Sequence, residues 1–142
     1  MRLALREAER ALEHDDVPVG CVIAREGEVV AAAPNERELR GDPTAHAEIL
    51  ALREAAAGSG DWRLSDASLY VTLEPCAMCA GAIVLARVPR VVYGAADPKT
   101  GAAGSVLDVL GESQLNHRPE VAGELLAGES GELLRSFFVE RR

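Results

Sequence analysis

The order strand, helix, strand between residues 68 and 94 limits the possible folds more than any other feature of this chain. Ser68 to Leu73 reads as a strand, Pro75 suits the first turn of a helix, and Ala77 to Arg87 continues with helical spacing. A second strand, Arg90 to Gly94, follows at once. Strands joined by a crossover helix pair in parallel, and such sheets carry helices on their faces. The segment therefore predicts an α/β fold.

The residues before this unit add a hairpin and two helices. Apolar residues at helical spacing predict a helix over residues 2–14. Two β-branched runs, 17–24 and 28–33, predict the antiparallel strands of a hairpin. A second helix is expected to open with His46-Ala47-Glu48, after Asp42-Pro43-Thr44, and to stop near residue 58. Together with the crossover unit, these elements predict a mixed sheet with helices on both faces.

The last third of the chain is rich in Gly and small residues and gives weaker signals. We expect a short helix over residues 106–110, an edge strand around 120–122 and a final helix from about Glu124. The predicted fold is a three-layer α/β/α sandwich with about five strands. No internal repeat or linker interrupts the sequence, so residues 1–142 are expected to form one domain.

Composition excludes some classes of protein. The apolar stretches are too short and too interrupted to cross a membrane, and the first residues lack the apolar core of a secretory signal. A cytoplasmic location follows as an expectation. The formal charge of −8 disfavours a general nucleic-acid coat, which needs clustered Lys and Arg. Basic residues of the C-terminal half could still gather on one surface: Arg87, Arg90, Lys99, Arg118, Arg135, Arg141 and Arg142.

Cys76 and Cys79 have the spacing of a metal-binding pair. Three residues apart at a helix start, their side chains project from the same side of the helix. The helix N-terminus favours thiolate, which is the form that binds metal. His46 and Glu48 lie in the first turn of another predicted helix, and two helix starts that face each other would form a site. Three cysteines in the whole chain argue against a disulfide framework.

The number of ligands distinguishes the possible sites. One histidine and two cysteines leave a position for water, as catalytic zinc sites do, whereas structural sites close with four protein ligands. Glu48 could then move protons between this water and a substrate amine. Two alternatives remain. The Cys pair could be a redox dithiol, or a structural site could recruit a fourth ligand from His14, His117 or Cys21.

The two-part pattern His46-Ala47-Glu48 and Pro75-Cys76-Ala77-Met78-Cys79 matches the signature of zinc-dependent nucleobase deaminases, H-x-E followed by P-C-x-x-C. Further segments resemble bacterial tRNA-specific adenosine deaminases over nearly the whole chain. These segments are Pro18-Val19-Gly20, Asp42 to Ile49, Leu69 to Cys76, Lys99 to Ser105 and Asn116-His117-Arg118.

The resemblance implies a cytidine-deaminase-like fold and hydrolytic conversion of adenosine to inosine at the wobble position of a tRNA anticodon. It implies one Zn²⁺ per subunit held by His46, Cys76 and Cys79, with Glu48 as the catalytic residue. It also implies a homodimer that binds the anticodon stem-loop. The substrate contacts implied by the resemblance are Asn35, Ala47, Asp97, Lys99 and His117, with the C-terminal helix also touching RNA.

Two other functions are compatible with the same residues. The acidic charge and the shared metal core would also suit a deaminase of free bases or nucleosides, acting on guanine, cytosine or adenosine. A binding module that keeps zinc only for stability is a third possibility, from a different class of protein.

Overall fold

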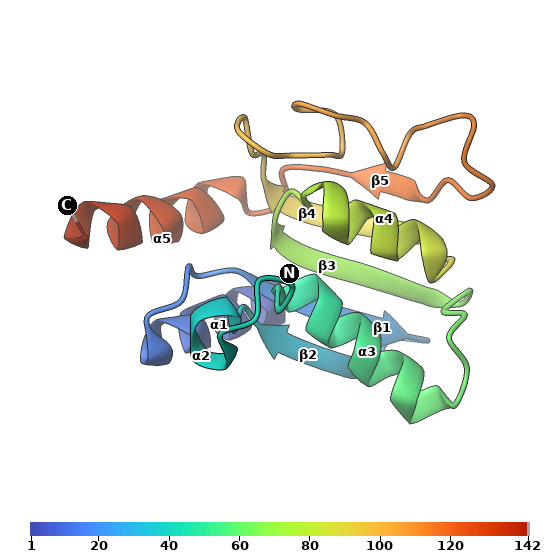
Figure 1. The fold of residues 1–142 in the computed structure, drawn as a ribbon, viewed down its shortest axis with the longest axis horizontal. Helices are drawn as coiled ribbons and strands as arrows, with labels where there is room; N and C mark the ends of the chain where they lie inside the picture. Colours follow the sequence, from blue (N-terminus) through green and yellow to red (C-terminus); the bar gives the residue numbers. More distant parts are fainter. Residues whose placement is uncertain (142) are drawn as a thin grey trace.

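A five-stranded mixed sheet is the frame of the structure (Figure 1). The computed structural model describes residues 1–141, so Arg142, one of the basic residues noted above, lies outside the described part. The sheet order is β2-β1-β3-β4-β5. The strands are β1 (Gly20–Arg25), β2 (Glu28–Pro34), β3 (Ala67–Leu73), β4 (Arg90–Ala95) and β5 (Glu120–Ala122). Strand β1 is antiparallel to β2 and β3, whereas β4 is parallel to β3 and β5.

The helices connect these strands and cover the sheet. They are α1 (Arg2–Ala11), which continues as one 3-10 turn (Leu12–His14), α2 (Arg37–Arg40), α3 (Ala47–Ser59), α4 (Ala77–Leu85) and α5 (Ala127–Glu140). Helix α4 joins β3 to β4, and these two strands pair in parallel. The crossover unit predicted from the sequence is therefore confirmed. The hairpin β1–β2 and the edge strand β5 are also confirmed.

Alternate residues of β1 contact helices on opposite faces of the sheet. A Cβ atom on Gly20 would overlap the backbone of α1 at Ala4 and Ala8. The next residue, Cys21, belongs instead to the core that contains Leu50 of α3. Because neighbouring strand residues point to opposite faces, α1 and α3 cover opposite sides.

Strand β4 repeats this arrangement. Gly94 faces Ser130 of α5, whereas Val91 joins the core with Ile83 of α4. Helices α3 and α4 lie next to each other on one face of the sheet (Figure 1). The three-layer α/β/α sandwich expected from the sequence is confirmed.

The predicted helix over residues 106–110 was wrong. The carbonyl oxygen of Gly101 accepts backbone hydrogen bonds from Val106 at 3.0 Å and from Leu107 at 3.1 Å, which closes a loop. Gly104 within this loop has φ +124°. Such a conformation leaves the helical region, so the apolar residues that follow do not continue a helical turn.

Two further boundaries differ from the sequence expectation. Helix α5 begins at Ala127 instead of near Glu124, because Glu124 and Leu126 adopt φ of 65° and 56°, which a right-handed helix does not allow. Helix α2 has no counterpart among the elements expected from the sequence. It is four residues long, which is too short for a periodic pattern to reveal. Among residues 1–141, no helix is long and apolar enough to cross a membrane.

Candidate active site

The starts of α3 and α4 carry the three predicted metal ligands. His46 is the N-cap of α3 and Cys76 is the N-cap of α4, each with extended backbone angles. Their carbonyl oxygens accept the first helical hydrogen bonds, from Leu50 at 3.1 Å and Ala80 at 2.8 Å. An extended N-cap residue turns its side chain away from the helix body, so both side chains reach the space between the two helix starts. Cys79 follows on the first turn of α4.

The distances between these side chains fit a tetrahedral metal. Nδ1 of His46 lies 3.7 Å from Sγ of Cys76 and 3.5 Å from Sγ of Cys79. All three ligand atoms lie within 4.8 Å of one another. Zinc bonds of about 2.0 Å to nitrogen and 2.3 Å to sulfur, at tetrahedral angles, require N···S separations of roughly 3.6 Å. The three residues could therefore hold one metal ion without rearrangement.

The residues considered as a fourth ligand are engaged elsewhere. Nδ1 of His14 lies 2.6 Å from a carboxylate oxygen of Asp16, and Nε2 of His117 lies 2.6 Å from the carbonyl oxygen of Val88. Cys21 is fully buried in the core beneath α3. Within residues 1–141, the group that converges contains one histidine and two cysteines. That number of protein ligands leaves a tetrahedral ion one position for solvent.

The two thiols differ strongly in acidity. A hydrogen bond from the Cys79 thiol, followed by one from His46, lowers the pKa of Cys76 to about 4. The same bond to Cys76, together with burial, raises the pKa of Cys79. The bond to Cys76 raises the pKa of His46. A metal cation that bound here would displace the protons of Cys79 and His46, because thiolate and neutral imidazole are the forms that bind metal.

Glu48 lies beside this group without belonging to it. It is the second residue of α3, and only 4% of its surface is exposed. Burial, opposed by the nearby His46, raises the pKa of Glu48 to about 7. A carboxyl group with a pKa near neutrality can both accept and donate a proton under physiological conditions. Its placement next to the metal ligands suits a proton carrier.

A cavity of about 150 Å³ opens in front of these residues. This volume is below the range of about 300 to 1,000 Å³ that is typical of sites for drug-sized molecules, so it suits a single planar ring. The cavity is lined by residues of the two helix starts and of the neighbouring strand ends and loops: Val17, Val19, Asn35, Arg37, His46, Ala47, Glu48, Leu73, Glu74, Cys76, Asp97 and Thr100.

Three of the five predicted substrate contacts, Asn35, Ala47 and Asp97, lie in this lining. The amide of Asn35 donates to the carbonyl oxygen of Val17 at 3.1 Å and accepts from the backbone nitrogen of Arg37 at 3.2 Å. Each amide group keeps one further hydrogen-bonding position. Asn35 can therefore hold its own loop and still bind a ring edge.

The other two predicted contacts do not line the cavity. Lys99 is exposed on the loop after β4, where its backbone nitrogen donates to Oδ1 of Asp97 at 2.9 Å. His117 is partly buried against the carbonyl oxygen of Val88, at the far end of α4. Any role for these two residues must involve a substrate that extends beyond the cavity.

Six lining residues were not among the predicted site residues, and two of them, Arg37 and Glu74, are charged. Glu74 directly precedes the Pro-Cys pair, so its place between a strand end and a metal ligand could have singled it out. Arg37 follows Asn35 by two positions, but it belongs to the short helix α2, which no periodic pattern announces.

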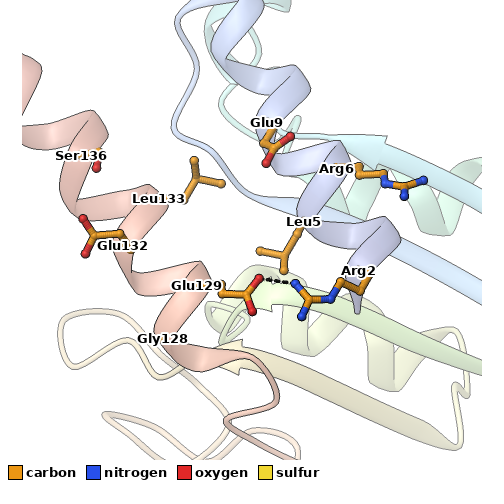
Figure 2. A pocket seen from close by; sticks show the side chains of 9 residues that line it. All are labelled: Arg2, Leu5, Arg6, Glu9, Gly128, Glu129, Glu132, Leu133 and Ser136. Atoms are coloured by element: carbon orange, nitrogen blue, oxygen red, sulfur yellow. Dashed lines mark hydrogen bonds and ion pairs between the residues drawn. The ribbon is translucent and has the colours of Figure 1, made fainter.

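A second and larger hollow, of about 750 Å³, lies between α1 and α5 (Figure 2). Its side chains carry charges of both signs, and Arg2 forms an ion pair with Glu129 across it. It contains neither a histidine nor a cysteine. The smaller cavity is therefore the one that adjoins the candidate metal ligands.

Comparison with known proteins agrees with this geometry. The family model for MafB19-like deaminases matches residues 1–142. A tRNA-specific adenosine deaminase of Bacillus subtilis (strain 168) is 49% identical over 142 residues, which cover 100% of this chain and 88% of that protein. A structure solved in a study of A-to-I editing by tRNA:A34 deaminases is 47% identical, with a TM-score of 0.91 over 94% of this chain and 97% of that one.

A more distant solved structure is a guanine deaminase from Bacillus subtilis. It is 31% identical, with a TM-score of 0.66 over 99% of this chain and 90% of that chain. Both the identity and the structural similarity to the tRNA-directed proteins are higher. The chain is a MafB19-like deaminase and belongs to the family of tRNA-specific adenosine deaminases.

Proposed function

We propose that this protein hydrolyses adenosine to inosine at the wobble position of a tRNA anticodon, with release of ammonia. The observation that carries the proposal is the meeting of His46, Cys76 and Cys79 beside the buried Glu48, at the end of a cavity sized for one ring. Full-length relatives named tRNA-specific adenosine deaminase support the choice of substrate.

The resident metal in this proposal is one Zn²⁺, held by His46, Cys76 and Cys79. Two sulfurs and one imidazole nitrogen are ligands that zinc prefers, and their separations match its tetrahedral geometry. When bound, the ion supplies a Lewis acid that brings the pKa of a coordinated water close to neutrality. His46, Cys76 and Cys79 would hold the ion at the starts of α3 and α4, and His46 and Cys76 line the cavity.

Glu48 carries protons in the proposed reaction. The water that attacks the carbon bearing the amine gives up a proton to the carboxylate. Glu48 passes this proton to the ring nitrogen. It then takes the second proton from the hydroxyl group formed on the attacked carbon and delivers it to the departing amine, so that the carbon–nitrogen bond breaks, ammonia leaves and an oxo group remains. Burial of Glu48 favours this shuttle, because its raised pKa of about 7 makes both protonation states accessible.

The cavity selects a base that has left its stack. Asn35 can offer a donor and an acceptor to the ring edge, and Ala47 and Asp97 also line the cavity. A base inside a helix cannot reach such a pocket, so an anticodon loop, in which bases are unpaired, is a suitable substrate.

Binding of the rest of the RNA is proposed for residues outside the cavity. Lys99 and His117 are the candidates that the resemblance suggested, and Arg141 stands on the C-terminal helix. The homodimer, the single domain and the cytoplasmic location expected from the sequence stay predictions.

An assay with three kinds of substrate tests the proposed function. Purified zinc-loaded protein is offered an anticodon stem-loop with adenosine at the wobble position, the same stem-loop with guanosine there, and free nucleobases and nucleosides. Inosine in the first RNA and ammonia are measured. We expect turnover of the first RNA; turnover of free guanine with an untouched stem-loop would refute the tRNA assignment in favour of the guanine deaminase activity named for the 31% identical structure.

The variant Glu48→Gln tests the mechanism and the binding-module alternative. It keeps the shape of the side chain but cannot carry the proton, so we expect turnover to fall by at least roughly 10² to 10⁴-fold. The zinc content should stay at one ion per chain, because Glu48 is not among the three ligands. A loss of zinc would show that the assigned role is wrong. Equal inactivity of wild type and variant on every substrate would support a non-catalytic module.

A further inference from the structure

We propose that Glu74 is a positioning residue for the deamination reaction, because its buried carboxylate holds the loop of residues 97–105 against the candidate metal centre. The inference rests on the proposed function for its catalytic consequence. Its structural part, the attachment of the loop to Glu74, stands independently. Glu74 was absent from the candidate residues derived from the sequence.

Glu74 follows β3 directly and lies two residues before the ligand Cys76. It is 2% exposed. Its Oε1 accepts the backbone N–H of Asp97 at 3.0 Å, and its Oε2 accepts those of Ala103 at 2.9 Å and Ser105 at 3.1 Å. The hydroxyl of Ser105 donates a fourth hydrogen bond to Oε1. All four donors belong to the 97–105 loop.

These bonds make Glu74 and the loop depend on each other. A buried carboxylate without partners is strongly disfavoured, and in the described residues no Lys or Arg nitrogen forms an ion pair with Glu74. The loop supplies the missing partners. The carboxylate in turn satisfies three backbone N–H groups that no helix or strand engages.

The same bonds argue against a proton-transfer role for Glu74. A carboxylate offers about four lone-pair positions, and the loop fills four of them. Among residues 1–141, no loop offers Glu48 a comparable set of donors; its hydrogen bonds are with its own backbone N–H and the Cys79 thiol. Two carboxylates therefore line one cavity with different tasks, one free to exchange protons and one committed to the backbone.

The close approach of Gly101 is a second, independent observation. A Cβ atom on Gly101 would overlap the carboxyl group of Glu74 and lie 2.6 Å from the carbonyl oxygen of Asp97. Gly101 also forms a β-bridge with Cys76, and the next residue, Ala102, donates to the carbonyl oxygen of Pro75 at 2.8 Å. The loop thus passes directly over the metal-ligand segment, where only glycine fits.

The loop also holds two residues of the cavity wall, Asp97 and Thr100, in place. Oδ1 of Asp97 accepts the backbone N–H of Thr100 at 3.2 Å, and its Oδ2 accepts the Thr100 hydroxyl at 2.7 Å. Asp97 and Thr100 both line the cavity, and exposed Lys99 stands between them. Releasing Glu74 would therefore displace one wall of the pocket and the exposed tip that carries Lys99, while the three ligands keep their places.

The test compares Glu74→Gln and Gly101→Ala with the exposed control Glu13→Gln in the zinc-loaded full chain. Both loop variants should keep one zinc per chain. Their KM for the anticodon stem-loop should rise by about 10- to 100-fold with a smaller change in kcat, because a wall displaced by about 1 Å costs on this order. Ser105→Ala, which removes one of the four donors, should raise KM only about threefold. Glu13→Gln should match wild type.

Hydrogen exchange separates failure of this inference from failure of the proposed function. Amides of Asp97, Ala103 and Ser105 should exchange at least tenfold faster in Glu74→Gln than in wild type, whatever the substrate is. Unchanged exchange, unchanged KM or loss of zinc in Glu74→Gln would each overturn the inference. If exchange is faster in Glu74→Gln but wild type itself leaves the stem-loop untouched, the loop attachment is confirmed and the tRNA substrate is refuted. If Glu74→Gln does not fold, Ser105→Ala gives the same readouts.

Discussion

The substitution Gly20→Ala should destabilise this protein although it adds a single methyl group. The new Cβ would overlap the backbone oxygen of Ala4 and the backbone nitrogen of Ala8, and would lie 2.8 Å from Cβ of Glu7. These are atoms of the regular helix α1, which cannot yield locally. Helix α1 would have to move off the sheet, and overpacking of this kind costs about 1 to 3 kcal/mol.

Glycine to alanine at Gly58 is the matched control. Gly58 lies inside α3, and nothing stands within 4 Å of an added Cβ there. Alanine favours the helix over glycine by about 0.5 to 1 kcal/mol, so this variant should be more stable than wild type. Urea unfolding of both variants, followed by circular dichroism, measures the difference. Equal stability of Gly20→Ala and wild type would refute the reasoning, because it would mean that α1 adapts freely.

Three further outcomes are expected. In the protein stripped of metal by a chelator, the raised pKa of Glu48 keeps its proton in the folded state while the unfolded chain loses it. The lowered pKa of Cys76 acts in the opposite direction, but it does so in both wild type and Glu48→Gln. Urea titrations should therefore show that the free energy of unfolding of wild type falls by about 3 kcal/mol relative to that of Glu48→Gln as the pH rises from 4.5 to 7; a constant difference would contradict the raised pKa of Glu48. Metal analysis after dialysis should show that Cys76→Ala has lost its zinc under conditions in which wild type retains one ion per chain. Retention of one full equivalent of zinc by the variant would contradict the ligand assignment. Asp16→Asn should lower the free energy of unfolding in urea by about 1 to 3 kcal/mol. The fully buried carboxylate accepts the backbone N–H groups of Glu38 at 2.6 Å and Leu39 at 3.1 Å, and the amide would replace one of these acceptors with a donor. A stability equal to that of wild type would show that α2 does not need this cap.

The frame of the fold was predictable from local patterns. The β3–α4–β4 unit has a proline and two cysteines at a helix start and two β-branched strands around it, so its type and direction followed from the sequence. The same patterns identified which helix starts would carry the ligands. Their meeting follows from topology, since α3 and α4 pack against each other and follow β2 and β3, which run in the same direction and so end on the same side of the sheet.

The parts that escaped prediction depend on contacts between distant residues. Helix α2 is capped by Asp16, more than twenty positions earlier, and nothing local to the helix announces it. The loop after β4 is shaped by Glu74 and by a glycine that passes over it. The spacing of apolar residues over Val106 to Leu110 predicts a helix, because it contains no information on distant acceptors such as the buried carboxylate of Glu74.

The placement of His46 and Cys76 thirty positions apart has a consequence for the denatured chain. An ion that joined them would have to close a loop through the whole of α3 and β3, which the unfolded chain does only rarely. Such an ion would therefore bind the folded chain in preference to the unfolded one, and its binding free energy would add to the free energy of unfolding.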